Sequence, residues 1–315
     1  PFFNAMSIDA TSQYILLTGE SYAHMRPKLH GLYLYTIATG EMRCLIEPGT
    51  REVGISALWG ENAFFAGKPT DVHEDTRMYC DMFLMPLAGG EAKLLCGYDH
   101  YIGRGTINSD VRLGGGKGIL LEGGKLYFIA TVGTRNDLYC VDEQGCISGP
   151  FTPDGSCDGF DRFGDSTVWV GLYGNSLMEL YLNGEAVTSF NTAYRETYDL
   201  VPVEHLVYHG EADVDGWVMK PTNYEPGKKF PAILHVHGGP CTAFSDVYHH
   251  EMQMWANHGY FVFFCNPRGS DGKGEAFANI RGKYGTVDYE DLMAFLDYAL
   301  SQYPDADPDK VGVTG

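Results

Sequence analysis

Short runs of apolar and aromatic residues, each followed by a turn that contains glycine, recur along about the first 190 residues of the chain. Four of these runs share one theme and begin about 40 to 55 residues apart. They are "LYLYTIATGE" (32–41), "MFLMPLAGGE" (82–91), "LYCVDEQGC" (138–146) and "MELYLNGE" (178–185). Further strand-like runs begin at Tyr14, Asn62, Lys125 and Ser166, so each unit holds several short strands.

The interval between the runs predicts the fold of this half of the chain. A four-stranded blade of a β-propeller takes about 40 to 50 residues. We therefore predict a partial, antiparallel β-propeller of about four blades in residues 1–193. The chain opens in the middle of a unit, so we expect further blades upstream of Pro1. A β-sandwich is the alternative, and only the repeat argues against it.

The pattern changes near Tyr194, where strands begin to alternate with helices. The predicted elements are a hairpin (His205 to Tyr208, then Gly216 to Lys220), a buried strand (Ala232 to Val236), a helix closed by Gly259, an apolar strand (260–265), an amphipathic helix (Asp288 to Tyr303) and a strand that begins at Lys310. Such alternation indicates a parallel sheet. Residues 194–315 are therefore predicted to be a linker and the N-terminal part of an α/β domain.

Composition and charge narrow the range of functions. A chain of 315 residues that is 44% apolar can bury a sizeable core, and its length fits two domains. Its net charge of −19 would repel a phosphate backbone, so we expect no nucleic-acid partner. No run approaches the roughly 20 apolar residues of a membrane span, so we expect no membrane partner. The eight cysteines form no C-x-x-C pair, which favours a reducing compartment and predicts a cytoplasmic protein.

The apolar strand at Ala232 to Val236 ends in an unusual tetrapeptide, His237-Gly238-Gly239-Pro240. Ligand sites of α/β sheets gather at this end of the strands. Glycines there leave amide N–H groups unshielded, and acyl-transfer enzymes use such amides to hold a developing oxyanion. A plain Gly-Gly turn is the alternative, and the tetrapeptide alone does not decide between the two.

Two further stretches connect the tetrapeptide to a known family. "NPRGSDGKGEAF" (266–277) follows the next apolar strand, and "RGKYGTVDYEDLMAFLDYAL" (281–300) comes soon after it. Together with HGGP they resemble the catalytic domain of the prolyl oligopeptidase family of serine peptidases, most closely its acylaminoacyl-peptidase-like branch. Members join a β-propeller to an α/β-hydrolase domain, so the resemblance implies a hydrolase domain in residues 194–315. Lys273, where an aromatic residue is common, and Tyr284, in place of Trp, depart from the pattern and bear on substrate preference more than on fold.

The resemblance implies a role for each residue of these motifs. It assigns the backbone N–H of Gly239 to one arm of the oxyanion hole, with His237, Gly238 and Pro240 shaping the loop. Arg268 looks like a scaffold residue that anchors loops near the site. None of Arg268, Asp288 and Asp291 is a proton carrier.

The same resemblance places the nucleophile outside the chain. The family's nucleophile elbow, G-G-S-Y-G-G, would begin at Gly315, so the serine would lie two residues further on and the triad Asp and His later still. Asp288 and Asp291 only open a helix, where acidic residues favour the helix dipole. We therefore predict a serine-type peptidase as the parent protein, and expect these 315 residues alone to be inactive.

Substrate class and alternatives also follow from the family. Its propeller restricts the active site to short peptides, which implies oligopeptide substrates, of acylaminoacyl-peptidase or oligopeptidase type, and no cofactor. A dipeptidyl peptidase of the same family is one alternative, although the paired glutamates that hold a substrate amino terminus do not occur as Glu-Glu in this sequence. A non-catalytic propeller that binds peptides is another. The oligomeric state stays open, with a homo-oligomer among the alternatives.

For the other candidate groups, the sequence favours a structural role over a catalytic or binding one. His235 and His237 share one face of a strand, but no third ligand is spaced near them, so no metal site is predicted. Cys241 follows the tetrapeptide without a motif of its own and is taken as a buried thiol. The "LGGGKG" run at 113–118 lacks the Ser or Thr of a phosphate-binding loop, so a hairpin loop is preferred there.

Overall fold

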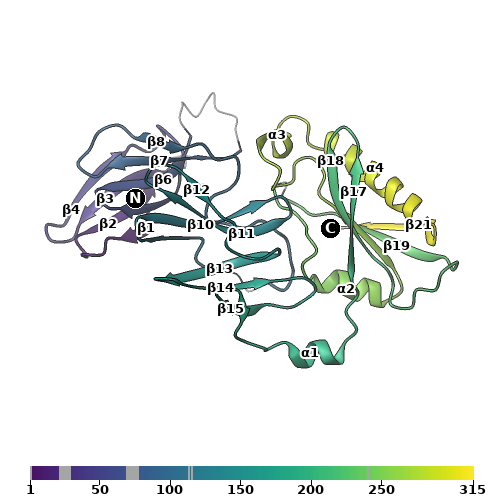
Figure 1. Ribbon diagram of the computed structural model, residues 1–315. Helices are drawn as coiled ribbons and strands as arrows, with labels where there is room; N and C mark the ends of the chain where they lie inside the picture. Colours follow the sequence, from purple (N-terminus) through teal and green to yellow (C-terminus); the bar gives the residue numbers. More distant parts are fainter. Residues whose placement is uncertain (1, 21–29, 69–77, 113, 115, 240) are drawn as a thin grey trace. The chain divides into compact units, whose positions relative to one another are not determined.

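A computed structural model shows a chain built mostly of strands (Figure 1). It describes residues 2–20, 30–68, 78–112, 114, 116–239 and 241–315. The strands form four sheets. Contacts divide the chain into two compact units, Pro1–Gly103 with Ile119–Phe128 and Cys140–Ser148, and Arg104–Gly118 with Ile129–Tyr139 and Gly149–Gly315. This division follows compactness, and the predicted boundary between residues 193 and 194 stays a prediction.

The first two sheets each consist of four antiparallel strands in chain order. The strands are β1 (Phe2–Ile8), β2 (Tyr14–Glu20), β3 (Gly31–Thr36) and β4 (Glu41–Ile46), then β5 (Val53–Trp59), β6 (Asn62–Gly67), β7 (Asp81–Pro86) and β8 (Lys93–Cys96). Buried side chains from both sheets, among them Leu16, Leu32 and Phe65, form one apolar cluster. Four antiparallel strands with a buried apolar face are the unit of a propeller blade.

The third sheet consists of two more such groups. Its strands are β9 (Ile119–Glu122), β10 (Lys125–Val132), β11 (Arg135–Asp142) and β12 (Ile147–Ser148), then β13 (Ser156–Phe163), β14 (Ser166–Leu172), β15 (Glu179–Leu182) and β16 (Glu185–Ala186). A parallel pairing of Asn136 with Ser156 joins the two groups. The four runs of the repeat are the third strands, β3, β7, β11 and β15, and the runs between them are the second strands. The predicted partial propeller of about four blades is confirmed.

The fourth sheet belongs to the α/β part of the chain. Its strands are β17 (Val203–His209), β18 (Asp213–Met219), β19 (Phe230–His235), β20 (Phe261–Cys265) and β21 (Ala306–Thr314), in the order β17-β18-β20-β19-β21. The strands β20, β19 and β21 run parallel, while β17 and β18 form the predicted antiparallel hairpin. The sheet is therefore mixed, and only its parallel part is built from strands that alternate with helices.

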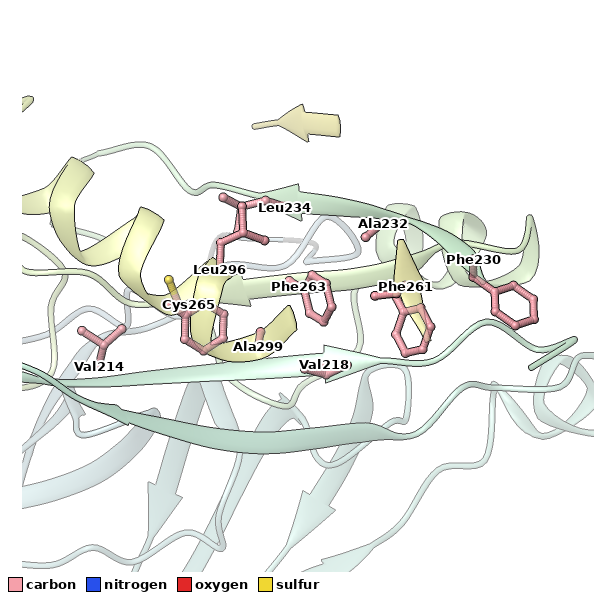
Figure 2. Packing of buried hydrophobic residues seen from close by; sticks show 12 residues of the cluster. Val214, Val218, Phe230, Ala232, Leu234, Phe261, Phe263, Cys265, Leu296 and Ala299 are labelled. Carbon is pink, nitrogen blue, oxygen red and sulfur yellow. The ribbon is translucent and has the colours of Figure 1, made fainter. Parts of the chain in front are cut away.

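The core of this part lies between the sheet and helix α4 (Val287–Gln302). Figure 2 shows Leu296 and Ala299 of α4 beside Phe263 and Cys265 of β20. Gly216 on β18 makes the contact close, because a Cβ atom there would lie 2.2 Å from the ring of Phe295. The absence of a side chain thus lets a buried aromatic residue of α4 rest directly on the strand backbone.

Three other helices lie in the described residues: α1 (Thr192–Thr197), α2 (His250–Asn257) and α3 (Glu275–Ala278). The sequence pattern predicts α2 and α4, whereas α1 and α3 are too short to show a helical period. The carboxylate of Asp110 accepts the backbone N–H groups of His250 and Glu251, at 2.7 and 2.8 Å, and so satisfies the first turn of α2. In the described part of the chain, no helix is both long and apolar enough to cross a membrane.

Candidate active site

The two motif loops meet at one edge of the fourth sheet. Strands β19 and β20 are parallel neighbours, with His235 opposite Phe264, so the loops that follow them leave the sheet at the same edge. The loop after β19 contains His237, Gly238 and Gly239, and the loop after β20 contains the NPRGS motif. This is the edge at which α/β sheets bind ligands. The structure therefore brings together the two motifs that are about 30 residues apart in the sequence.

Gly238 and Gly239 form the exposed part of the first loop. Gly239 has a φ of 137°, which L-residues with a side chain rarely adopt, whereas the φ of Gly238 lies outside that region. Among the described residues, no hydrogen bond is recorded from the backbone N–H of either glycine. Within the described residues the Gly239 amide is therefore unpaired, and its role as an oxyanion donor stays a prediction. Pro240, the last residue of the tetrapeptide, lies outside the described residues.

The His237 side chain ties the first loop to the second. Its Nε2 lies 2.9 Å from the hydroxyl of Ser270, and its Nδ1 lies 3.0 Å from the hydroxyl of Thr242. Burial lowers the pKa of His237, which keeps the ring neutral at pH 7. Ser270 is fully buried, so it cannot reach a substrate. The pair fixes the loops relative to each other, and His237 has no ring nitrogen left for proton transfer.

Arg268 anchors the second loop to helix α4. Its Nε and one terminal nitrogen bind the two carboxylate oxygens of Asp291, each at 2.8 Å, and its backbone N–H binds the same carboxylate at 2.9 Å. The other terminal nitrogen binds Glu211 at 2.9 Å. The hydrogen bonds to Asp291 raise the pKa of Arg268. Because both ends of this bidentate pair are fixed, the backbone at Arg268 has little freedom to move.

A small cavity of about 70 Å³ opens between the two motif loops and the start of helix α4. Six of the residues that line it are His237, Gly238, Arg268, Ser270, Tyr284 and Asp288. One carboxylate oxygen of Asp288 is buried and has no hydrogen-bond partner in the structure. The volume suffices for a few water molecules, which could satisfy that oxygen, and is too small for a peptide.

A buried histidine lies directly below the first loop. The ring of His235 packs against Phe244, Trp255 and His249, with ring centroids 5.3, 5.2 and 5.4 Å away. Its Nδ1 has no hydrogen-bond partner. The Nδ1 atom of His249 lies 3.3 Å from the carboxylate of Asp110, but the geometry is not that of a hydrogen bond. His235 thus sits in surroundings that disfavour a positive charge.

This environment predicts a pH-dependent stability. Burial, helped by the rings of His249 and His237, lowers the pKa of His235 from 6.5 to about 4. The unfolded chain therefore binds the proton more readily, so the free energy of unfolding falls as the pH drops from about 6.5 to about 4, and His235 adds no change below that range. We expect this residue to account for up to about 3 kcal/mol of the loss.

Urea unfolding of the wild type and of His235→Phe, at about pH 7.5, 5.5 and 4.5, measures this loss. Phenylalanine keeps the aromatic packing and removes the titrating group. We expect the variant to lose less stability on acidification, and the remaining loss comes from other groups, among them His237 and His249, whose pKa values burial also lowers. Equal losses in the two proteins would contradict the assignment.

The sequence analysis did not identify two hydroxyl groups of the site, those of Ser270 and Thr242. Ser270 lies inside the NPRGS motif, but the motif alone does not say that its hydroxyl meets His237. Thr242 lies three residues beyond Gly239 and carries no motif of its own. Its hydroxyl donates to the carbonyl of Gly238 at 2.5 Å. Only the folded structure shows that Thr242 contacts Gly238 and that Ser270 contacts His237.

Comparison with known proteins finds similarity to one family. Residues 246–315 match the model of the prolyl oligopeptidase family. An uncharacterized peptidase of Bacillus subtilis, YuxL, is 39% identical over 132 residues, which cover 41% of this chain and 20% of that protein. Dipeptidyl-peptidase 5 of Aspergillus fumigatus is 34% identical over 100 residues, which cover 31% of this chain and 14% of that protein.

Solved structures agree on the fold along the whole chain. An acylaminoacyl peptidase from Pyrococcus horikoshii superposes with a TM-score of 0.80 and 23% identity, over all of this chain and 48% of its own length. A puromycin-hydrolyzing peptidase of Mycobacterium tuberculosis superposes with a TM-score of 0.65 and 18% identity, over all of this chain and 49% of its own length. The chain thus spans about half the length of the structures it matches. Its sequence motifs, its family match over residues 246–315 and its fold agree, and together they support the prolyl oligopeptidase family for this chain.

Proposed function

We propose that the full-length protein is a serine peptidase that hydrolyses short peptides. The observation that carries the proposal is the free amide of Gly239 at the carboxyl edge of a parallel sheet, in a chain of the prolyl oligopeptidase family. The nucleophilic serine would lie just beyond Gly315, after β21, and its Asp and His partners would lie further along the chain, as the family's pattern implies.

In this mechanism the residues of the chain bind and orient, and they transfer no proton. The serine, deprotonated by the triad His, attacks the peptide carbonyl, and negative charge develops on the carbonyl oxygen. The N–H of Gly239 would donate a hydrogen bond to that oxygen, together with the N–H of the residue after the serine. A donor fixed in advance costs no reorganisation when the charge develops, which is why such groups contribute strongly to the rate.

Two substrate classes are supported by different observations. One solved structure that matches over the whole chain is an acylaminoacyl peptidase. The curated relatives include dipeptidyl-peptidase 5. We keep the acylaminoacyl type, which the motifs imply, as the first proposal and the dipeptidyl peptidase as its alternative. Rates on one peptide with an acetylated and with a free amino terminus distinguish the two, and a preference for the free form would favour a dipeptidyl peptidase.

A fluorophosphonate probe tests the proposal itself. The mass of the intact purified protein is measured before and after reaction with the probe. A mass above 34.8 kDa that gains one probe would support the serine peptidase, since 34.8 kDa is the mass of these 315 residues. A larger protein that gains no probe would contradict it, and would favour a propeller that binds peptides without cleaving them. The 315-residue chain alone is expected to gain none.

A further inference from the structure

The peptide group between Gly238 and Gly239 contains both the candidate oxyanion donor and a second, restrained atom. Because a peptide group is planar and trans, its C=O and its N–H point in opposite directions. Here the oxygen belongs to Gly238 and the N–H to Gly239. Whatever holds the Gly238 oxygen therefore also sets the direction of the Gly239 N–H.

This peptide has little intrinsic preference for one orientation. Neither flanking residue has a Cβ atom, so rotation of the whole group meets few steric barriers. A rotation by half a turn would aim the Gly238 carbonyl at the place where the oxyanion forms, and would repel the charge that the amide stabilises. A site that relies on this amide needs a restraint on the peptide.

The hydroxyl of Thr242 supplies such a restraint. Its Oγ1 donates to the Gly238 oxygen at 2.5 Å. Its methyl group and backbone N–H also lie close to Gly239, since a Cβ atom built on Gly239 would come within 3.3 and 3.1 Å of them. Thr242 thus lies against both halves of the Gly-Gly unit.

The ring of His237 completes the arrangement. The hydroxyl of Thr242 has a single hydrogen, which it donates to the Gly238 oxygen. Nδ1 of His237 lies 3.0 Å from the Thr242 hydroxyl oxygen and 3.1 Å from the Gly238 oxygen. It can bind these two oxygens only if it carries the ring proton. Nε2 is then an acceptor for the hydroxyl of Ser270 at 2.9 Å. One consistent set of hydrogen positions satisfies all four groups, with the neutral ring that burial favours.

Thr242 is itself fixed through its backbone. Its carbonyl accepts the N–H of Asp271 at 3.1 Å, and the N–H of the next residue, Ala243, binds the carbonyl of Thr106 at 3.1 Å. The carboxylate of Asp271 in turn binds the hydroxyl of Thr106 at 2.7 Å, and all three of these residues are buried. The restraint on the Gly-Gly peptide is thereby tied to the protein interior.

We propose that Thr242 is a positioning residue, whose hydroxyl holds the Gly238–Gly239 peptide in the orientation that presents the Gly239 N–H to the substrate. The inference rests on the proposed function and adds a residue for which the motifs assign no role. Loss of the hydroxyl would allow the peptide to rotate, so the oxyanion would be stabilised in only part of the molecules.

The test compares Thr242→Val with Thr242→Ser in the full-length protein. Valine has the shape of threonine without the hydroxyl, and serine keeps the hydroxyl. For Thr242→Val we expect a fall in kcat of about 10- to 100-fold with KM within about threefold, because the oxyanion forms only in the transition state. Thr242→Ser should recover most of kcat. The affinity of a peptide boronate, whose adduct places an oxygen at the same position, should fall in parallel with kcat, while the affinity of a product peptide should not.

The control and the outcomes separate this inference from the proposed function. Thr197→Val removes a similar bond, from a threonine hydroxyl to the carbonyl of Ala193 at 2.6 Å, far along the chain from the loop, and should leave kcat unchanged. If the wild type gains the fluorophosphonate but Thr242→Val keeps kcat within twofold, or Thr242→Ser is equally impaired, the positioning role is wrong. If the wild type gains no probe, the proposed function fails. Should the valine variant not fold, Thr242→Ala takes its place.

Discussion

Gly239→Val is expected to lower kcat of the full-length protein by about 10²- to 10³-fold, the usual loss when one oxyanion donor is removed. Two features of the loop make the substitution disruptive. The φ of 137° at Gly239 is a conformation that valine does not adopt without strain, and a Cβ atom would lie 2.9 Å from the backbone nitrogen of Cys241. The peptide must shift to relieve both, so its N–H leaves the position that the oxyanion requires.

Gly238→Ala is the matched steric control. A Cβ atom on Gly238 meets nothing within 4 Å, and its φ lies outside the left-handed region, so we expect a much smaller loss of rate. Steady-state kinetics on one short peptide, with thermal unfolding of each variant, measures both effects. If Gly239→Val keeps kcat within a few-fold of the wild type, the amide of Gly239 is not an oxyanion donor.

The propeller could be predicted from the sequence because its signal repeats. One strand and turn of each blade, β3, β7, β11 and β15, has nearly the same apolar pattern, so four weak signals support one another. The short outer strands of the later blades, β12 and β16, have two residues each and leave no period to detect. Their place in the sheet depends on pairing with a neighbour, which is a property of the fold.

The α/β part could be predicted for a different reason. Strand β20 is buried on both faces, β19 is buried on one face and half-buried on the other, and both appear as continuous apolar runs, while α4 shows a helical period. The start of β21 could not be predicted from the sequence, because Ala306–Thr314 begins with a polar stretch, "ADPDK", which lacks an apolar pattern. Pairing with β19 extends that strand beyond its own signal.

The motifs predict a backbone role for Gly239, but they do not predict the contacts around it. A motif names residues that are neighbours in the sequence, whereas Ser270 and Thr106 reach this loop through tertiary structure, and the contact of Thr242 with Gly238 depends on how the loop folds. Asp291 shows the same limit. Its place near the start of a helix suggested a dipole role, yet in the structure its carboxylate binds Arg268 from the preceding loop.

That pair leads to the second large expected effect. Asp291→Ala should lower the free energy of unfolding by about 3 to 5 kcal/mol, the usual loss when one member of a buried ion pair is removed. Asp291 is 5% exposed and accepts three hydrogen bonds from Arg268, so its loss leaves two donors of a largely buried guanidinium and one backbone N–H without their partner. The loop that carries Ser270 would lose its anchor at the same time.

Glu211, the second partner of Arg268, provides the control, because it has the same charge as Asp291 but is exposed to water. The side chain of Glu211 is 81% exposed and binds the same guanidinium at 2.9 Å, so Glu211→Ala removes one carboxylate from the same arginine. Water replaces that partner, and we expect a loss of about 1 kcal/mol or less. Urea unfolding of both variants at pH 7 measures the difference. Equal losses would mean that charge balance on Arg268, and not the buried bidentate contact with Asp291, holds the loop, because both variants remove one carboxylate but only Asp291 is buried and bidentate.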